Sequence, residues 1–185
     1  MDGRNKKFIL DLQKKPAVRR SSGLYTVDGP KMAGELDLAD VENVYVTKSF
    51  LASGHAADCA ELLKNVSYEL IQDSEMKQIS DTVSPQGILV VAKQRKTRGI
   101  RAITEGVKAP LILILETIQD PGNLGTIIRM AEAAGVTGII MNKETVDAYS
   151  PKVVRSTMGA LLRLPFVAVD DAVKAAGALA AGEYT

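Results

Sequence analysis

The feature that most constrains the fold is a run of five consecutive aliphatic residues at positions 111–115. A strand that is apolar at every position is typically buried on both faces of a parallel sheet. The run is far shorter than the roughly 20 residues of a membrane-spanning helix. Helix-like stretches separate it from two further apolar runs, at 136–141 and 166–169. Such β–α repeats predict parallel strands joined by right-handed crossovers.

The first half of the chain shows a similar alternation, which predicts a separate small α/β unit. Helix-like stretches occur at 55–64 and 73–79, and the second opens with a cap-like Asp73-Ser74. Short apolar runs predict strands at 24–27, 44–46, 68–71 and 87–92.

A change in composition marks the boundary between the two units. Residues 93–108 are rich in Lys and Arg, contain Gly99 and Gly106, and have almost no acidic residue. Such a segment is typical of a linker. We therefore predict a first domain at 1–95, a linker at 96–108 and a second domain at 109–185.

Charge is nearly balanced over the chain, with 23 Lys and Arg against 22 Asp and Glu, so any contact with nucleic acid must use local clusters. The first twenty residues form one, with seven Lys or Arg and two Asp. This cluster is either a phosphate-contacting arm or a solvated helix face. The single cysteine and the lack of a signal-like N-terminus favour the cytoplasm.

His55 and Cys59 are spaced i, i+4, as two metal ligands on one helix would be. The chain has no other Cys or His to complete a zinc site, so we predict no metal site. We expect His55 at the surface and Cys59 as a small buried hydrophobe.

The segment after the run at 111–115 carries the most distinctive motif, DPGNLGTIIR at 120–129. Its apolar residues recur at helical spacing, which predicts a helix from about Asn123 to Gly135. Arg129 falls roughly 150° from the centre of the apolar stripe, so with Gly125 it belongs to a face open to a ligand or a partner subunit.

Asn123 follows the carboxyl end of a parallel strand, where open α/β sheets place their sites. A capping Asn and a solvated Arg are the alternative interpretation. The motif is neither a dinucleotide fingerprint nor a Walker loop. Glu116 and Asp120 flank the loop as possible acid–base groups, although Asp120 before Pro121 also suits a simple turn.

A second helix is predicted at 150–164, with Ser150 as N-cap and Pro151 at its first position. One stripe of this helix is basic and sterically open, which suits a phosphate or ribose, although an ordinary amphipathic helix is the alternative. Its members are Lys152, Arg155, Ser156, Gly159 and Arg163.

Taken together, residues 120–129 and 150–160 closely resemble the SpoU (TrmH-type) branch of the SPOUT RNA methyltransferases. The first unit resembles the family's substrate-binding domain, although Asp28 stands where the family more often has Glu. The landmarks are Arg19-Arg20, residues 23–25, Asp28-Gly29 and residues 85–88.

The resemblance implies a small N-terminal α/β/α RNA-binding domain and a parallel-sheet α/β domain of the SPOUT trefoil-knot type. It implies methyl transfer from S-adenosylmethionine to a ribose 2′-hydroxyl of RNA, carried out by a homodimer. Large-subunit rRNA is the expected substrate. A tRNA ribose methyltransferase and a non-catalytic RNA-binding module are the alternatives.

The resemblance also implies site residues. Arg129 matches the catalytic arginine, and Asn123 the residue that positions the active-site loop and the ribose. A guanidinium stays protonated and is a poor general base, so we assign Arg129 to binding phosphate and stabilising the incipient alkoxide, with direct proton abstraction as the alternative. The expected RNA, substrate or dimer contacts are Arg19, Arg20, Gly125, Lys152, Arg155 and Ser156.

The family continues past the strand at 166–169 with a Gly-Asn-Glu-like loop and a Ser-Leu-Asn segment, which this sequence lacks. Those segments form the knot and most of the cofactor pocket. We therefore expect a truncated chain with weak or no binding of S-adenosylmethionine and with an exposed sheet edge.

Overall fold

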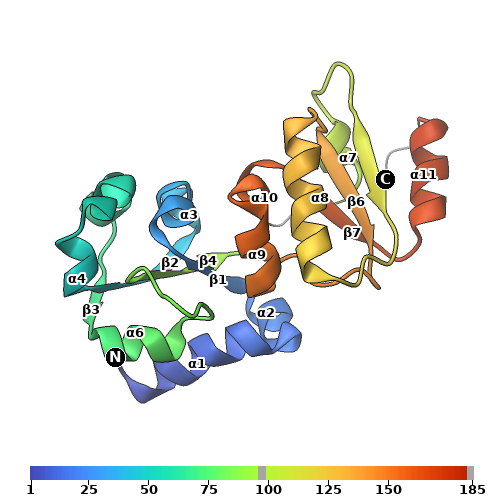
Figure 1. The fold of residues 1–185 in the computed structure, drawn as a ribbon. Helices are drawn as coiled ribbons and strands as arrows, with labels where there is room; N and C mark the ends of the chain where they lie inside the picture. The colour runs from blue at the N-terminus through green and yellow to red at the C-terminus, as the bar shows by residue number, and fades with distance from the viewer. Residues whose placement is uncertain (96–98, 183–185) are drawn as a thin grey trace. The chain divides into compact units, whose positions relative to one another are not determined.

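The computed structural model describes residues 1–95 and 99–182 (Figure 1). The chain forms two compact units, Met1–Gln94 with Tyr149–Pro151, and Arg95–Ala148 with Lys152–Thr185. Residues 96–98 of the predicted linker lie outside the described residues.

The first unit is built on a four-stranded mixed sheet with the strand order β1-β4-β2-β3. β4 runs antiparallel to both β1 and β2, and β3 runs parallel to β2. All four strands predicted in this half are confirmed within a few residues. Their bounds are β1 Leu24–Asp28, β2 Val41–Thr47, β3 Glu69–Ile71 and β4 Ile88–Lys93.

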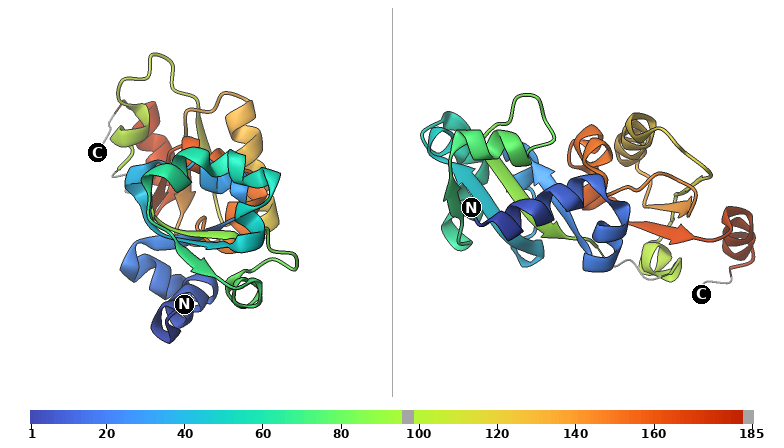
Figure 2. Two further views of the ribbon diagram at one scale, coloured as in Figure 1. Left: turned by 90° about the vertical axis from the view of Figure 1, so that its left-hand side faces the viewer. Right: turned by 90° about the horizontal axis from the view of Figure 1, so that it is seen from below.

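Helices cover both faces of this sheet, giving an α/β/α unit (Figures 1 and 2). On one face, α1 (Gly3–Lys14) and α6 (Asp73–Ile79) bury Ile9, Leu12 and Met76 against the strands. The predicted helix at 73–79 is confirmed, whereas 55–64 divides into a 3₁₀ helix and a short α-helix. The remaining helices are α2 Pro16–Ser22, α3 Pro30–Gly34, η1 Leu38–Asp40, α4 Lys48–Leu51, η2 Gly54–Cys59 and α5 Ala60–Asn65.

The second unit has a three-stranded parallel sheet in the order β5-β6-β7. The strands are β5 (Ile112–Leu115), β6 (Gly138–Asn142) and β7 (Phe166–Val169), as the apolar runs predicted. α8 (Pro121–Ala133) packs on one face (Figure 1). α7 (Arg101–Thr104) and α11 (Ala172–Ala180) pack on the other.

The predicted linker therefore contains a helix, because α7 places Ile103 in the core of the second unit. No helix among the described residues is long and apolar enough to cross a membrane.

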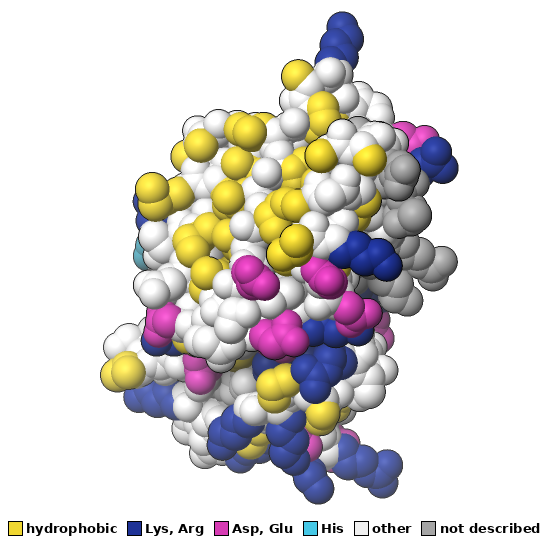
Figure 3. Space-filling model, turned by 90° about the vertical axis from the view of Figure 1, so that its right-hand side faces the viewer, with side chains coloured by type: hydrophobic (Ala, Val, Ile, Leu, Met, Phe, Trp, Pro, Cys, Tyr) yellow, Lys and Arg dark blue, Asp and Glu magenta, His cyan; other side chains and the backbone are white. Residues whose placement is uncertain are grey.

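The prediction that residues 111–115 are buried on both faces is wrong for most of the run. Only Leu115 is buried, and Leu111 is 53% exposed. In the described sheet β5 pairs with β6 alone, so one of its edges has no neighbouring strand to shield the side chains. Figure 3 shows hydrophobic side chains at the surface on this side of the second unit.

Candidate active site

The turn after β5 and the start of α8 are fixed by Asp120. Its Oδ1 accepts a hydrogen bond of 2.8 Å from the backbone N–H of Asn123, and Pro121 occupies the first helical position. The helix therefore begins two residues before the predicted start, because aspartate and proline together form a strong N-terminus. At its other end, Gly135 has the positive φ of 78° expected of the predicted terminal glycine.

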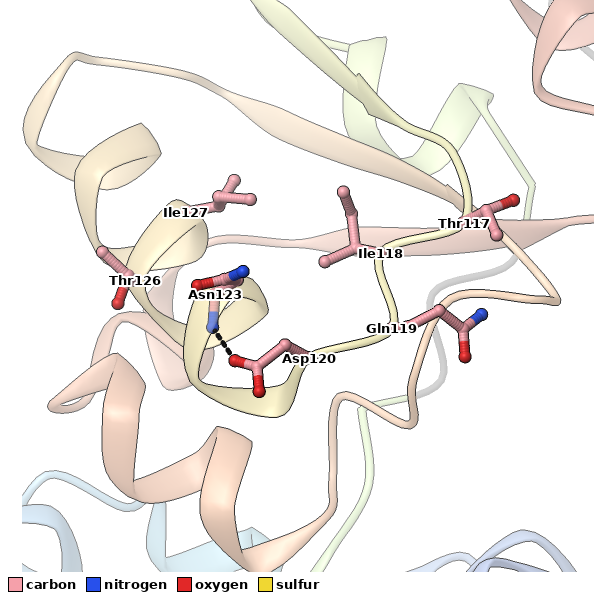
Figure 4. A pocket seen from close by; sticks show the side chains of 7 residues that line it. All are labelled: Thr117, Ile118, Gln119, Asp120, Asn123, Thr126 and Ile127. Carbon is pink, nitrogen blue, oxygen red and sulfur yellow. Dashed lines mark hydrogen bonds between the residues drawn. The ribbon is translucent and has the colours of Figure 1, made fainter.

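A cavity of about 480 Å³ lies between this turn and the first two turns of α8. Ile118 on the turn and Asn123 on the helix lie on two sides of the space (Figure 4). The structure thus places Asn123 at the predicted location, exposed beside the carboxyl end of a parallel strand. The lining residues are Thr117, Ile118, Gln119, Asp120, Asn123, Thr126 and Ile127.

Arg129 is exposed, as predicted, but it is not among the lining residues. It lies six residues beyond Asn123, about 9 Å along the helix and about 120° around it. On α8, Gly125, Arg129 and Glu132 share one flank at i, i+4 and i+7. The structure therefore presents Asn123 to the cavity and Arg129 to a different side of the same helix.

The prediction that Gly125 lies on an open face is wrong. Gly125 is buried, and a Cβ atom on it would lie 2.3 Å from the Cβ of Ser156 and 3.0 Å from the carbonyl oxygen of Val153. Its function in this fold is close packing between α8 and α9 (Pro151–Thr157). Ser156 is half-buried at this contact, and its hydroxyl donates a hydrogen bond of 2.8 Å to the carbonyl of Lys152.

The prediction of one continuous helix at 150–164 is also wrong. Met158 (φ 49°) and Gly159 (φ 93°) adopt left-handed conformations, which divide the segment into α9 and α10 (Ala160–Arg163). Two successive left-handed residues cannot continue an α-helix. The predicted basic stripe is therefore interrupted.

The basic residues of this segment have different environments. The Lys152 ammonium is exposed and lies 3.9 Å from the Asp120 carboxylate, beside the cavity. Arg163 is bound to Glu132 on α8 through hydrogen bonds of 2.5 and 3.0 Å. Those bonds hold the pKa of the Glu132 carboxyl below its usual value. Arg155 is half-buried.

In the first unit, the structure contradicts the prediction that Arg19 contacts substrate. Arg19 is 2% exposed, and its Nη1 donates to the carbonyl oxygens of Leu12 at 2.5 Å and Gln13 at 3.0 Å. These carbonyls belong to the last turns of α1, so the guanidinium stabilises a helix C-terminus. Arg20 is exposed and available to a ligand.

His55 and Cys59 behave as the sequence predicted. His55 is exposed, and Cys59 is buried with its thiol 3.1 Å from the carbonyl oxygen of Pro30. Burial raises the pKa of the Cys59 thiol to about 11. Within residues 1–95 and 99–182, no group of three His, Cys, Asp or Glu residues is placed to hold a metal ion.

Two residues that the sequence did not single out also shape the site. Thr117 has a positive φ of 56°, and Asn142 at the end of β6 hydrogen-bonds to it. An Asn directly after an apolar run was visible in the sequence, but its partner 25 residues away was not.

Comparison with known proteins finds a matching family model, similar curated proteins and similar solved structures. Residues 110–185 match the SpoU rRNA Methylase family. The human mitochondrial rRNA methyltransferase 3 is 41% identical over 107 residues, which make up 57% of this chain and 26% of that protein. An uncharacterised tRNA/rRNA methyltransferase of Synechocystis is 34% identical over 166 residues, 81% of this chain and 58% of that protein.

Among solved structures, the AdoMet-bound rRNA methyltransferase of Sinorhizobium meliloti superposes with a TM-score of 0.76 and 27% identity, over 95% of this chain and 66% of that one. The chain thus spans about a quarter to three fifths of the length of the two curated relatives. The family match, the relatives and the shared fold thus confirm the resemblance of residues 120–129 and 150–160 to the SpoU (TrmH-type) rRNA methyltransferases, whose family model matches residues 110–185 of this chain.

Proposed function

We propose that this chain acts in the transfer of a methyl group from S-adenosylmethionine to a ribose 2′-hydroxyl of large-subunit rRNA. The observation that carries the proposal is the cavity beside Asn123, at the carboxyl end of β5 and within the segment that matches the family. The rRNA methyltransferases among the relatives and the AdoMet-bound structure support the substrate and the methyl donor.

The residues around the cavity fit a nucleoside, the unit that RNA and S-adenosylmethionine share. The volume of about 480 Å³ lies within the roughly 300–1,000 Å³ of small-molecule sites. Ile118 and Ile127 offer apolar contact to a base, and the Asn123 amide and Asp120 carboxylate offer hydrogen bonds to ribose hydroxyls. When bound, S-adenosylmethionine would supply its sulfonium methyl group: the C–S bond would break, a C–O bond to the ribose would form, S-adenosylhomocysteine would leave, and the hydroxyl proton would pass to solvent.

Asn123 is proposed to orient the reacting ribose. Its backbone N–H is bonded to Asp120, so its backbone is fixed relative to the turn after β5. Arg129 is proposed to bind an RNA phosphate and to stabilise negative charge that develops on the 2′-oxygen. Because Arg129 lies on an exposed flank away from the cavity, it is also available to the site of a partner copy in the proposed homodimer.

RNA binding is assigned to the first unit. The exposed cations of α1 and α2 suit contact with a phosphate backbone, which supplies much of the affinity of RNA-binding proteins. They are Arg4, Lys7, Lys14, Lys15 and Arg20. The cytoplasm is the proposed compartment.

Deleting the gene and mapping 2′-O-methylation in total RNA tests the proposal. We expect the loss of one modification in large-subunit rRNA and its return when the wild-type gene is restored. Loss of a modification in tRNA instead would overturn the substrate assignment. An unchanged methylation map would overturn the proposed activity and favour a non-catalytic RNA-binding module.

A further inference from the structure

We propose that Asn142 is a positioning residue that holds the turn after β5 in a strained conformation and thereby forms one wall of the cavity. The inference rests on the proposed function, because the cavity is the proposed site. It is carried by the backbone of Thr117 and by the hydrogen bonds that join this turn to the turn after β6.

The strain lies at Thr117, whose φ is 56°. A β-branched residue in the left-handed region is a genuine outlier, because its branched side chain crowds the backbone. Among the described residues, only Thr117 and Met158 combine a side chain with a positive φ. Such a conformation persists only where its surroundings over-determine it, and it is often found at active sites.

The side chain of Asn142 makes the hydrogen bonds that hold Thr117 in this conformation. Asn142 is the last residue of β6, which pairs with β5 in a register that sets Leu115 beside Met141. Asn142 is buried, with only 7% of the residue exposed to solvent. Asn142 Oδ1 accepts from the Thr117 backbone N–H at 2.9 Å, and Nδ2 donates to Thr117 Oγ1 at 3.0 Å. One amide thus fixes both the backbone and the side chain of the strained residue.

Further bonds extend the same connection along the wall of the cavity. Thr145 Oγ1 donates to Asn142 Oδ1 at 2.8 Å, which fixes the orientation of the amide. The backbone N–H of Val146 donates to the carbonyl oxygen of Ile118 at 2.8 Å, and Gln119 Nε2 donates to the carbonyl oxygen of Glu144 at 2.6 Å. Residues 117–119 all line the cavity, so the turn after β6 sets the position of that wall.

This arrangement predicts a specific compensation. Removing the Asn142 side chain takes away the bonds that hold Thr117 in the left-handed region, so the turn relaxes and Ile118 moves. A glycine at 117 adopts the same conformation without the steric conflict. Replacing Thr117 by glycine should therefore restore the turn even when Asn142 is absent.

Amide hydrogen exchange in the 185-residue protein tests the structural half of the proposal. The Val146 amide is the reporter, because its acceptor is Ile118, and the Ile140 amide in the middle of β6 is the internal reference. We expect Asn142→Ala to speed exchange of Val146 at least tenfold relative to Ile140. Asn142→Ala with Thr117→Gly should return it to within about threefold of wild type. Val167→Ala, a core change on β7, is the matched control and should leave the ratio unchanged.

An unchanged ratio in Asn142→Ala would overturn the proposal, and so would a double variant that does not recover. If Asn142→Ala does not fold, Thr117→Val replaces only the hydroxyl that Asn142 Nδ2 contacts. It should speed Val146 exchange at least threefold, and wild-type exchange in this variant would overturn the proposal.

The effect of Asn142 on methylation is measured by restoring variant genes to the deletion strain. We expect at least a tenfold loss of the methylated nucleotide with Asn142→Ala, recovery to within about threefold in the double variant, and normal methylation with Val167→Ala. A general loss of stability should also lower methylation in Val167→Ala, which keeps the bonds of Asn142. If the wild-type gene restores no modification, the proposed function fails, while the exchange experiment still decides the position of the turn. If the modification survives Asn142→Ala, the positioning role fails and the proposed function stands.

Discussion

A Cβ atom added to Gly125 would lie 2.3 Å from the Cβ of Ser156, closer than the roughly 3 Å below which real Cβ atoms are essentially never found. Helices α8 and α9 can therefore meet at this point only because residue 125 is glycine. Arg129 follows Gly125 by one turn on the same flank. The contact that buries the glycine thus also determines where the proposed catalytic arginine lies relative to α9.

Replacing Gly125 by alanine should force the two helices apart and lower the free energy of unfolding by about 1–3 kcal/mol, as overpacking of a core does. Gly177 in α11 is the control, because it is exposed and a Cβ there meets nothing within 4 Å. Gly177→Ala should stabilise the protein by about 0.5–1 kcal/mol. Urea unfolding followed by circular dichroism measures both, and a stabilising Gly125→Ala would contradict the packing described above.

Arg19 and Arg20 are neighbours in sequence and should differ sharply on substitution. Arg19→Ala removes a buried guanidinium from two carbonyl groups at the end of α1, so we expect a loss of about 1.5–3 kcal/mol of stability. Arg20→Ala should change stability by less than about 0.5 kcal/mol, because the residue is exposed.

RNA binding separates the two residues in the opposite direction. Arg20→Ala should weaken affinity for an rRNA fragment and lower the salt slope by about one counterion. Affinity measured at several salt concentrations gives this slope. A folded Arg19→Ala protein with the same reduction in slope would argue that Arg19, too, contacts phosphate.

The pair of Glu132 and Arg163 should stabilise the second unit in a pH-dependent way. The pKa of Glu132 is lowered in the folded protein, so the stabilisation is present above the unfolded value of about 4.3 and is lost as pH falls through the folded pKa. The side chains are 31% and 48% exposed, so we expect only about 0.5 kcal/mol. The difference in unfolding free energy between wild type and Glu132→Gln should reach this value at pH 7 and shrink as the pH is lowered through the folded pKa of Glu132.

Arg129→Ala should reduce methyl transfer to RNA by at least about 100-fold, the scale on which one transition-state contact acts. The substitution should leave the affinity for S-adenosylmethionine the same as in the unsubstituted protein, because Arg129 does not line the cavity. Lys174→Ala on α11 is the control, since it removes an exposed cation from the same unit. Incorporation of labelled methyl groups into rRNA measures the effect, and full turnover by Arg129→Ala would refute the assignment.

The Cys59 thiol should be almost unreactive in the folded protein. Its pKa of about 11 leaves roughly one molecule in a thousand as thiolate at pH 8, and the residue is buried. We expect a disulfide reagent to label it at least 100-fold more slowly in native protein than in guanidinium. Equal rates would show that the buried site of Cys59 opens freely to solvent.

Local pattern determined the positions of the strands and the location of the candidate site. Apolar runs located all seven strands of the described residues, because the side chains by which a strand faces a core are apolar. The DPGN segment placed the start of α8 and Asn123 at the end of β5, since its aspartate and proline act within one helical turn. The family resemblance rested on the same local residues.

Tertiary structure alone decided which faces are accessible and which residues are strained. Helical periodicity gives the angle of Gly125 around its axis, but its burial depends on Ser156, 31 positions away. In the sequence Arg19 is one member of a basic cluster, but the fold buries it against the carbonyl groups at the end of α1. β5 is less buried than its sequence predicts because it has only one neighbouring strand in the described sheet. The bond from Asn142 to Thr117 likewise joins separate turns, because parallel strands bring distant carboxyl ends together at one edge of a sheet.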